Sequence, residues 1–169
     1  MSLFYFDNDI RIAEEKLDFS SAILRTESLL KHSEDSKYVA TLIINAWFYF
    51  VEGDVNRNPI NYQWQFFKEK WQQYIDTGLT LYDTKADVCF AAAYTLGLHG
   101  FLLGESYTKL SDVLYERCIR YCNDSSLLEL TDYYYNKKNA KSFPNKIKIC
   151  SDLFPNPSLI DAYFNDVIK

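Results

Sequence analysis

Residues 36–52 read SKYVATLIINAWFYFVE, and the apolar side chains in this stretch recur every three or four positions. The recurring residues are Val39, Leu42, Ile43, Ala46, Trp47 and Phe50. Because an α-helix completes a turn every 3.6 residues, this spacing gathers them on one helical face. The stretch therefore predicts a helix whose apolar stripe faces a core and which ends at Gly53.

The same periodicity extends through the rest of the chain. It predicts further helices at about 9–32, 60–77, 84–103, 107–123, 126–136, 144–153 and 157–168. We expect the first of these helices to break near Ser20 and Ser21, and the helix at 60–77 to end at Gly78. Pro144 and Pro157 are expected at the first positions of the last two helices.

Composition favours a single domain that spans residues 1–169. Hydrophobic residues make up 48% and aromatic residues 17%, with only 5 glycines and 4 prolines, which favours long packed elements over loops. Only residues 79–82 alternate as a strand would, and they are too few to build a sheet. We predict an all-α array or bundle of about 7–8 helices built from stacked αα-hairpins. Trp47 and Trp71 lie on apolar stripes of adjacent helices and should both be buried.

Two segments, 38–77 and 89–123, align as a possible internal repeat of a helical hairpin. Each contains a long helix, a turn with glycine and an acid, and a second helix. One explanation is a pair of stacked hairpins, as in tetratricopeptide-like or HEAT-like arrays. The other is chance similarity between two amphipathic hairpins, because identities are few and the tetratricopeptide consensus is absent.

The formal net charge is −5, from 18 basic and 23 acidic residues. An acidic balance argues against direct nucleic-acid binding, which needs basic patches to neutralise phosphates. The first residues have no basic n-region, and no window approaches 18 uncharged apolar residues, so neither a secretory signal nor a membrane span is expected. We therefore expect a cytoplasmic protein with reduced thiols. The cysteines are Cys89, Cys118, Cys122 and Cys150.

No combination of residues indicates catalysis or metal binding. The sequence contains no GxSxG, HExxH, Walker A or GxGxxG motif. Of the two histidines, His32 lies in a polar turn, and His99 lies on the most apolar predicted helix, where a hydrogen-bonded core histidine is favoured over a catalyst. The acidic pairs near Asp7 and Glu34 lie at predicted helix ends or turns, which favours caps or solvated faces. We expect no enzyme activity, no cofactor and no metal site.

A run of acids and tyrosines in the predicted helix at 126–136 is the candidate protein-binding surface. It consists of Glu129, Asp132, Tyr133, Tyr134 and Tyr135. Three successive helical positions span roughly 200° of the helix surface, so at least one tyrosine should be exposed. An exposed tyrosine beside a carboxylate is a common interface anchor, although a helix end with a solvated tyrosine explains the run equally well. The acidic hairpin turns around Asp54 and Glu105 are the alternative interface.

The chain resembles the immunity proteins of bacterial toxin–immunity pairs, such as those of contact-dependent growth inhibition systems. The resemblance rests on the short domain, the acidic balance, the missing catalytic set and aromatic-rich helices such as residues 45–50, NAWFYF. It implies a cytoplasmic protein that binds one cognate toxin, often a basic nuclease, one to one and occludes its active site. Two alternatives stay open. One is a helical-repeat adaptor for another protein, and the other is an enzyme or small-ligand binder that uses His99 and nearby aromatic residues.

Overall fold

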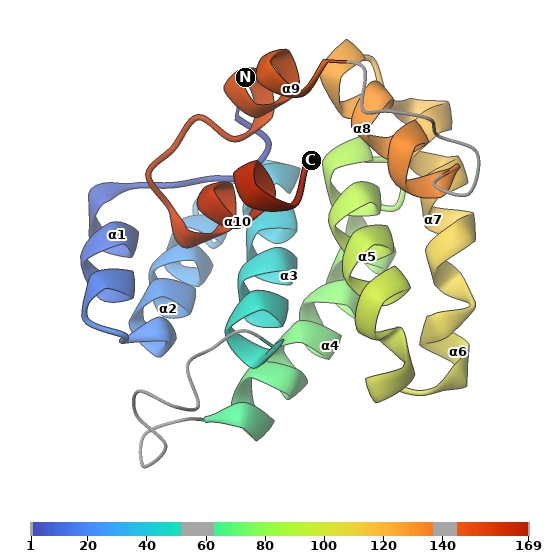
Figure 1. Ribbon diagram of the computed structural model, residues 1–169. Coiled ribbons are helices and arrows are strands. Elements are labelled where there is room, and N and C mark those ends of the chain that lie inside the picture. Colours follow the sequence, from blue (N-terminus) through green and yellow to red (C-terminus); the bar gives the residue numbers. More distant parts are fainter. Residues whose placement is uncertain (1, 52–62, 137–144, 169) are drawn as a thin grey trace.

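The computed structural model describes residues 2–51, 63–136 and 145–168, and all regular elements within them are helices (Figure 1). This confirms the all-α fold class. In chain order the helices are α1 Asn8–Glu15, α2 Phe19–Leu30, α3 Ser36–Val51, α4 Trp64–Leu81, α5 Ala86–His99, the 3-10 helix η1 Gly100–Leu102, α6 Glu105–Thr108, α7 Leu110–Tyr121, α8 Ser125–Tyr135, α9 Lys146–Leu153 and α10 Leu159–Val167.

The segment predicted as one helix at about 9–32 forms two helices, α1 and α2. The break between them lies at 16–18, before the predicted position near Ser20 and Ser21. Leu17 has a φ of 57°, and its N–H donates to the carbonyl of Glu14 at 3.0 Å. The N–H of Asp18 donates to the carbonyl of Ala13 at 2.8 Å, which completes a Schellman turn. The Asp18 carboxylate then accepts from the N–H of Ser21 and caps α2. The prediction was wrong because this left-handed position holds leucine, whereas glycine is the usual signal.

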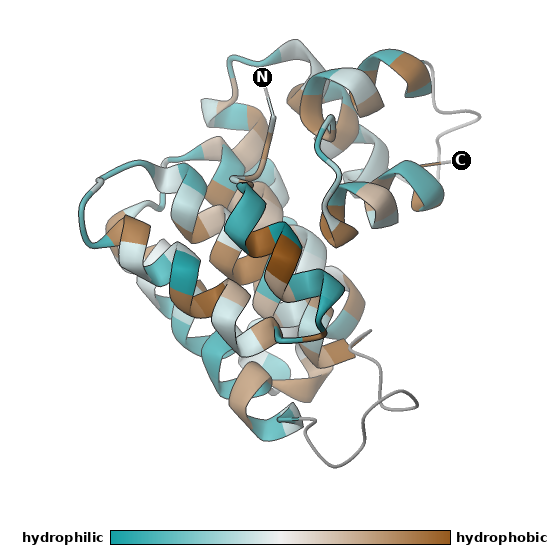
Figure 2. Ribbon diagram, turned by 90° about the vertical axis from the view of Figure 1, so that its left-hand side faces the viewer, coloured by the Kyte–Doolittle hydropathy of each residue, from teal (hydrophilic) through white to brown (hydrophobic). Residues whose placement is uncertain are grey.

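Helix α3 is the central element, and its burial is wider than one stripe. Trp47 and Leu42 on the predicted stripe are fully buried, but so are Ile44, Ala40 and Tyr49 on other faces. Helices α2, α4, α5 and α10 all pack against α3, which leaves little of it in contact with water. Most of the surrounding helices carry both hydrophobic and hydrophilic residues along their length (Figure 2). The core therefore forms around α3, with amphipathic helices as its outer layer.

Two hairpins, α3–α4 and α5–α7, pack beside each other through α3 and α5. Gly78 sits where these elements meet, because a Cβ there would lie 2.8 Å from Val88 Cγ1 and 3.3 Å from Ile43 Cδ1. The prediction that the helix ends at Gly78 was wrong, because α4 runs on to Leu81. Gly78 instead allows α3 and α5 to approach α4 closely. The residues 79–82 that alternate in sequence are therefore the last turn of α4 and its cap. That the two hairpins are copies of one repeat stays a prediction.

The C-terminal helices α9 and α10 pack against the N-terminal segment. The N–H of Leu3 donates to the carbonyl of Leu153 at 2.8 Å, and the rings of Phe154 and Phe164 stack at 4.4 Å. Pro157 is not the first residue of the last helix, because Ser158 caps α10 by accepting from the N–H of Asp161. The prediction for Pro144 falls outside the described residues.

Both tryptophans predicted to be core residues are fully buried, which confirms that prediction. The indole Nε1–H of Trp71 donates to Thr95 Oγ1, and that of Trp47 donates to His99 Nδ1, each at 3.1 Å. Burying an indole N–H without an acceptor is costly, and α5 supplies the acceptor for both tryptophans. His99 is thus a hydrogen-bonded, half-buried histidine, as the sequence favours.

Candidate functional site

The predicted acid and tyrosine run lies on α8, but its tyrosines are less exposed than expected. All three are half-buried. Tyr134 points inward, with its ring 4.9 Å from that of Tyr94 and 6.4 Å from that of Phe90. The expectation of at least one exposed tyrosine was wrong because α8 packs against α5, α7 and α9, and these neighbours cover more than one of its faces. Of the two acids in the run, Asp132 is exposed and Glu129 is half-buried.

Helix α7 adds carboxylates beside the tyrosine run. The Tyr135 hydroxyl donates to Glu116 Oε1 at 2.8 Å. This hydrogen bond, burial and the charges of Glu116 and Asp112 raise the pKa of Tyr135 above its usual value. Asp112 and Glu116 are four residues apart and share one exposed face of α7. Their spacing shows from sequence that they share a helical face, but not that this face lies beside α8.

A small cavity of about 220 Å³ opens between α5, α7 and α8. Its walls are Tyr94, Gly97, Leu98, Ser111, Asp112, Tyr115 and Tyr134. Three tyrosine rings from three helices thus face one space that carries a carboxylate at its edge. A Cβ on Gly97 would lie 2.9 Å from Ser111 Oγ, so the glycine permits the close packing that shapes this cavity. We name this cavity and two acids of α7, Asp112 in its wall and Glu116 one turn further on, the α5–α7–α8 face.

Exposed apolar residues border the α5–α7–α8 face. Leu98 lines the cavity and is 41% exposed, and Phe101, three residues along the chain, is 65% exposed. Large apolar side chains in water next to a cavity are typical of protein-binding surfaces. The face therefore combines the three parts of an interface centre, namely apolar anchors, a cavity and a charged rim.

The other predicted interface residues are not brought to this face. Glu105 is exposed and pairs with Lys109 on its own short helix, at 2.6 Å. That helix, α6, packs on α5, η1 and α7, whereas α8 packs on α5, α7 and α9. Asp54 lies outside the described residues.

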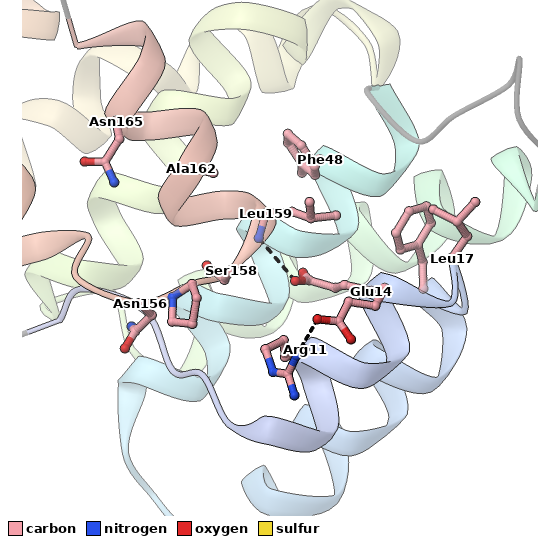
Figure 3. A pocket seen from close by; sticks show the side chains of 12 residues that line it. Arg11, Glu14, Leu17, Phe48, Asn156, Ser158, Leu159, Ala162 and Asn165 are labelled. Carbon is pink, nitrogen blue, oxygen red and sulfur yellow. Dashed lines mark hydrogen bonds and ion pairs between the residues drawn. The ribbon is translucent and has the colours of Figure 1, made fainter.

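A second cavity, of about 640 Å³, lies between α1 and α10 (Figure 3). We call it the α1–α10 groove. Its walls are Arg11, Glu14, Glu15, Leu17, Phe19, Phe48, Asn156, Pro157, Ser158, Leu159, Ala162 and Asn165. Glu14 Oε1 accepts from the Tyr49 hydroxyl at 2.7 Å, and Oε2 accepts from the N–H of Leu159 at 3.1 Å. Burial raises the pKa of Glu14, although these two hydrogen bonds act in the opposite direction.

Sequence alone did not indicate this groove. Glu14 lies within the first predicted helix, and Leu159 of α10, which donates to it, is 145 positions away. Proximity over that separation follows from the folding of the C-terminal segment back onto α1 and α3. In the part of the chain that the structure describes, no cluster of three or more histidine, cysteine or acidic residues could hold a metal ion.

No protein-family model matches the chain, and neither the curated proteins nor the solved structures contain a significant match to it. Within the described residues, the helices are too short or too polar to cross a membrane.

Proposed function

We propose that this chain is a protein-binding module of the immunity type, which inhibits a cognate bacterial toxin by occupying its active site. The observation that carries the proposal is the α5–α7–α8 face. There, three tyrosines line a cavity of about 220 Å³ together with Asp112 of α7, and Glu116 of α7 accepts from the Tyr135 hydroxyl. This volume is below the roughly 300–1,000 Å³ of small-molecule sites, so the cavity suits a single side chain of a partner.

The charge of the face favours a basic partner. Asp112 and Glu116 are both exposed, and a positive surface would be steered toward them during encounter. An arginine that enters the cavity would stack on tyrosine rings while its guanidinium meets Asp112. Nuclease active sites carry such basic residues to hold phosphate, and carboxylates would occupy the same positions. Direct nucleic-acid binding by this face is disfavoured, because its carboxylates would repel phosphates.

The proposed action is stoichiometric and needs no turnover. One copy of the chain covers one toxin domain, in the cytoplasm where the toxin acts. Exposed Leu98 and Phe101 would supply apolar area, and their burial would slow dissociation. The carboxylates would mainly set the association rate, which should fall as salt rises.

The test compares charge reversal on and off the face. Asp112→Lys combined with Glu116→Lys should weaken binding to the toxin domain encoded beside the gene by about 100-fold, or about 2.7 kcal/mol. Glu34→Lys, which changes an exposed acid in the turn before α3, is the matched control and should bind like the parent. Isothermal titration calorimetry gives both affinities. Equal affinity for the parent and the double variant would contradict the assignment of this face.

A helical-repeat adaptor is the second candidate, and the side-by-side packing of hairpins α3–α4 and α5–α7 favours it. Affinity capture from the native host followed by mass spectrometry distinguishes the two functions. An immunity protein should retain one toxin as its dominant partner. An adaptor should retain a different, non-toxin partner, and no toxin gene should lie beside its own.

A further inference from the structure

The α1–α10 groove combines apolar walls with a charged interior. Figure 3 shows Leu17 and Phe48 on one side and Asn156 and Ser158 on the other, with Glu14 between them. Its volume of about 640 Å³ falls within the range of small-molecule sites. An apolar enclosure with a few convergent polar groups is the usual construction of such sites.

Glu14 is a buried carboxylate without a basic partner among the described residues. It is only 5% exposed, and both of its hydrogen-bond donors, the Tyr49 hydroxyl and the Leu159 N–H, are neutral. The nearest cationic residue in the groove wall, Arg11, pairs with Glu15 instead. An ionised carboxylate removed from water is costly unless a cation compensates it.

A second buried carboxylate lies close by and increases this cost. Asp161 is 1% exposed and accepts from the N–H of Asn156 at 2.7 Å. Burial raises its pKa to about 6, and the charge of Glu14 contributes to that increase. The two acids therefore repel each other at the base of α10, and a cation in the groove would relieve that repulsion.

Leu17 supplies part of the apolar wall of the groove. Its φ of 57° belongs to the Schellman turn that ends α1, so the turn fixes where this side chain lies.

We propose that the α1–α10 groove binds a small organic cation, with an ammonium or guanidinium head at Glu14 and an apolar body between Leu17, Phe48 and Leu159. The cation supplies the charge that Glu14 lacks. The body replaces water along the apolar walls, to which the Phe48 ring belongs. This site is separate from the α5–α7–α8 face and does not depend on the proposed inhibition of a toxin.

The experiment titrates the full chain with matched aromatic ligands. The probes are 2-phenylethylamine and benzylguanidine as cations, 2-phenylethanol as the neutral analogue and 3-phenylpropionate as the anion. Isothermal titration calorimetry at pH 7.5 should show saturable binding of at least one cation. Binding of the neutral and anionic analogues should be about 10-fold weaker or undetectable. The two cations distinguish an ammonium from a guanidinium preference.

Three variants assign the binding to the groove. Glu14→Gln should reduce cation affinity about 10-fold, whereas Glu69→Gln, which removes an exposed acid of α4 outside the groove, should change it less than about 3-fold. Leu17→Gly relieves the backbone, so it should stay folded while cation affinity falls about 3-fold or more. Circular dichroism shows whether each variant is folded. Absence of cation binding, equal binding of 2-phenylethanol, or unchanged affinity in both Glu14→Gln and Leu17→Gly would overturn the proposal.

Discussion

The interior between α3 and α5 and the α1–α10 groove are both buried, but they are built from different chemistry. Between the central helices, the buried indole N–H groups of Trp71 and Trp47 donate to uncharged acceptors, Thr95 and His99. At the groove, Glu14 and Asp161 are buried acids, and Leu17 adopts a strained backbone. The interior therefore buries polar groups that are uncharged and hydrogen-bonded, as a stable fold requires. The groove instead buries two acids and contains an unfavourable backbone conformation. Departures of this kind mark places where a structure serves something other than stability.

The largest expected effect tests the interior. Trp71→Ala should lower the free energy of unfolding by ~3–5 kcal/mol, because it leaves a cavity and removes the hydrogen bond from the indole N–H to Thr95 Oγ1. Trp47→Ala should cost a similar amount. Urea denaturation followed by circular dichroism measures both. A cost below roughly 1 kcal/mol for either would show that its ring does not belong to the core.

Glu14→Ala tests whether Glu14 stabilises the fold through its hydrogen bonds to α3 and α10. The change leaves the buried Tyr49 hydroxyl and the Leu159 N–H without an acceptor, and each such group costs roughly 1–3 kcal/mol. Relief of a buried charge offsets part of this, so the net loss should be about 2 kcal/mol. The same denaturation assay applies. A variant more stable than the parent would show that the charge outweighs both hydrogen bonds.

Asp161 should make stability depend on pH with a defined sign. Because its pKa is about 6 in the folded chain and near 3.9 when unfolded, the folded state holds the proton more tightly between these values. Stability from this group is therefore greatest below about pH 4 and falls as pH rises through 6, by on the order of 2–3 kcal/mol. The charged group that acts on Asp161 is Glu14, and its charge also raises this pKa.

The Asp161→Asn variant isolates that contribution. Subtracting its free energy of unfolding from that of the parent at each pH cancels the groups that both proteins share. The difference should favour the parent at pH 4 relative to pH 7. A difference that is constant over this range would contradict the raised pKa of Asp161.

The smallest effect concerns Gly78, where α3, α4 and α5 meet. Alanine would gain about 1 kcal/mol of helix propensity, but its Cβ would press on Val88 Cγ1, and overpacking costs roughly 1–3 kcal/mol. Gly78→Ala should therefore be about 1 kcal/mol less stable than the parent. Adding Val88→Ala should show a favourable coupling between the two positions in a double-mutant cycle. Purely additive effects would mean that the two side chains do not meet.

The regular helices of the interior could be predicted from sequence, because apolar periodicity is a local property. Trp47 and Trp71 were placed correctly for that reason. The roles of Gly78 and Leu17 were not predicted. Gly78 lies within a helix, where it permits close packing, and Leu17 has the left-handed conformation that is typical of glycine. Local propensity points the wrong way at both positions, and only tertiary packing explains them.

The candidate site was predicted only in part. Of the tyrosine and acid run on α8, Tyr134 lines the cavity of the α5–α7–α8 face, where it packs against Tyr94. Asp112 and Glu116 were missed because they lie on another helix, and proximity between helices is not visible in a single sequence. The groove was missed for the same reason, since it joins α1 to α10.

Titration of the toxin domain with the full chain tests the proposed function most directly. The toxin is the one encoded beside the gene, and its residual activity is measured as the chain is added at concentrations far above the dissociation constant. If the chain acts by occupying the active site, activity should fall linearly and reach its minimum at one equivalent. Protection at strongly substoichiometric amounts would mean turnover and would contradict the binding mechanism.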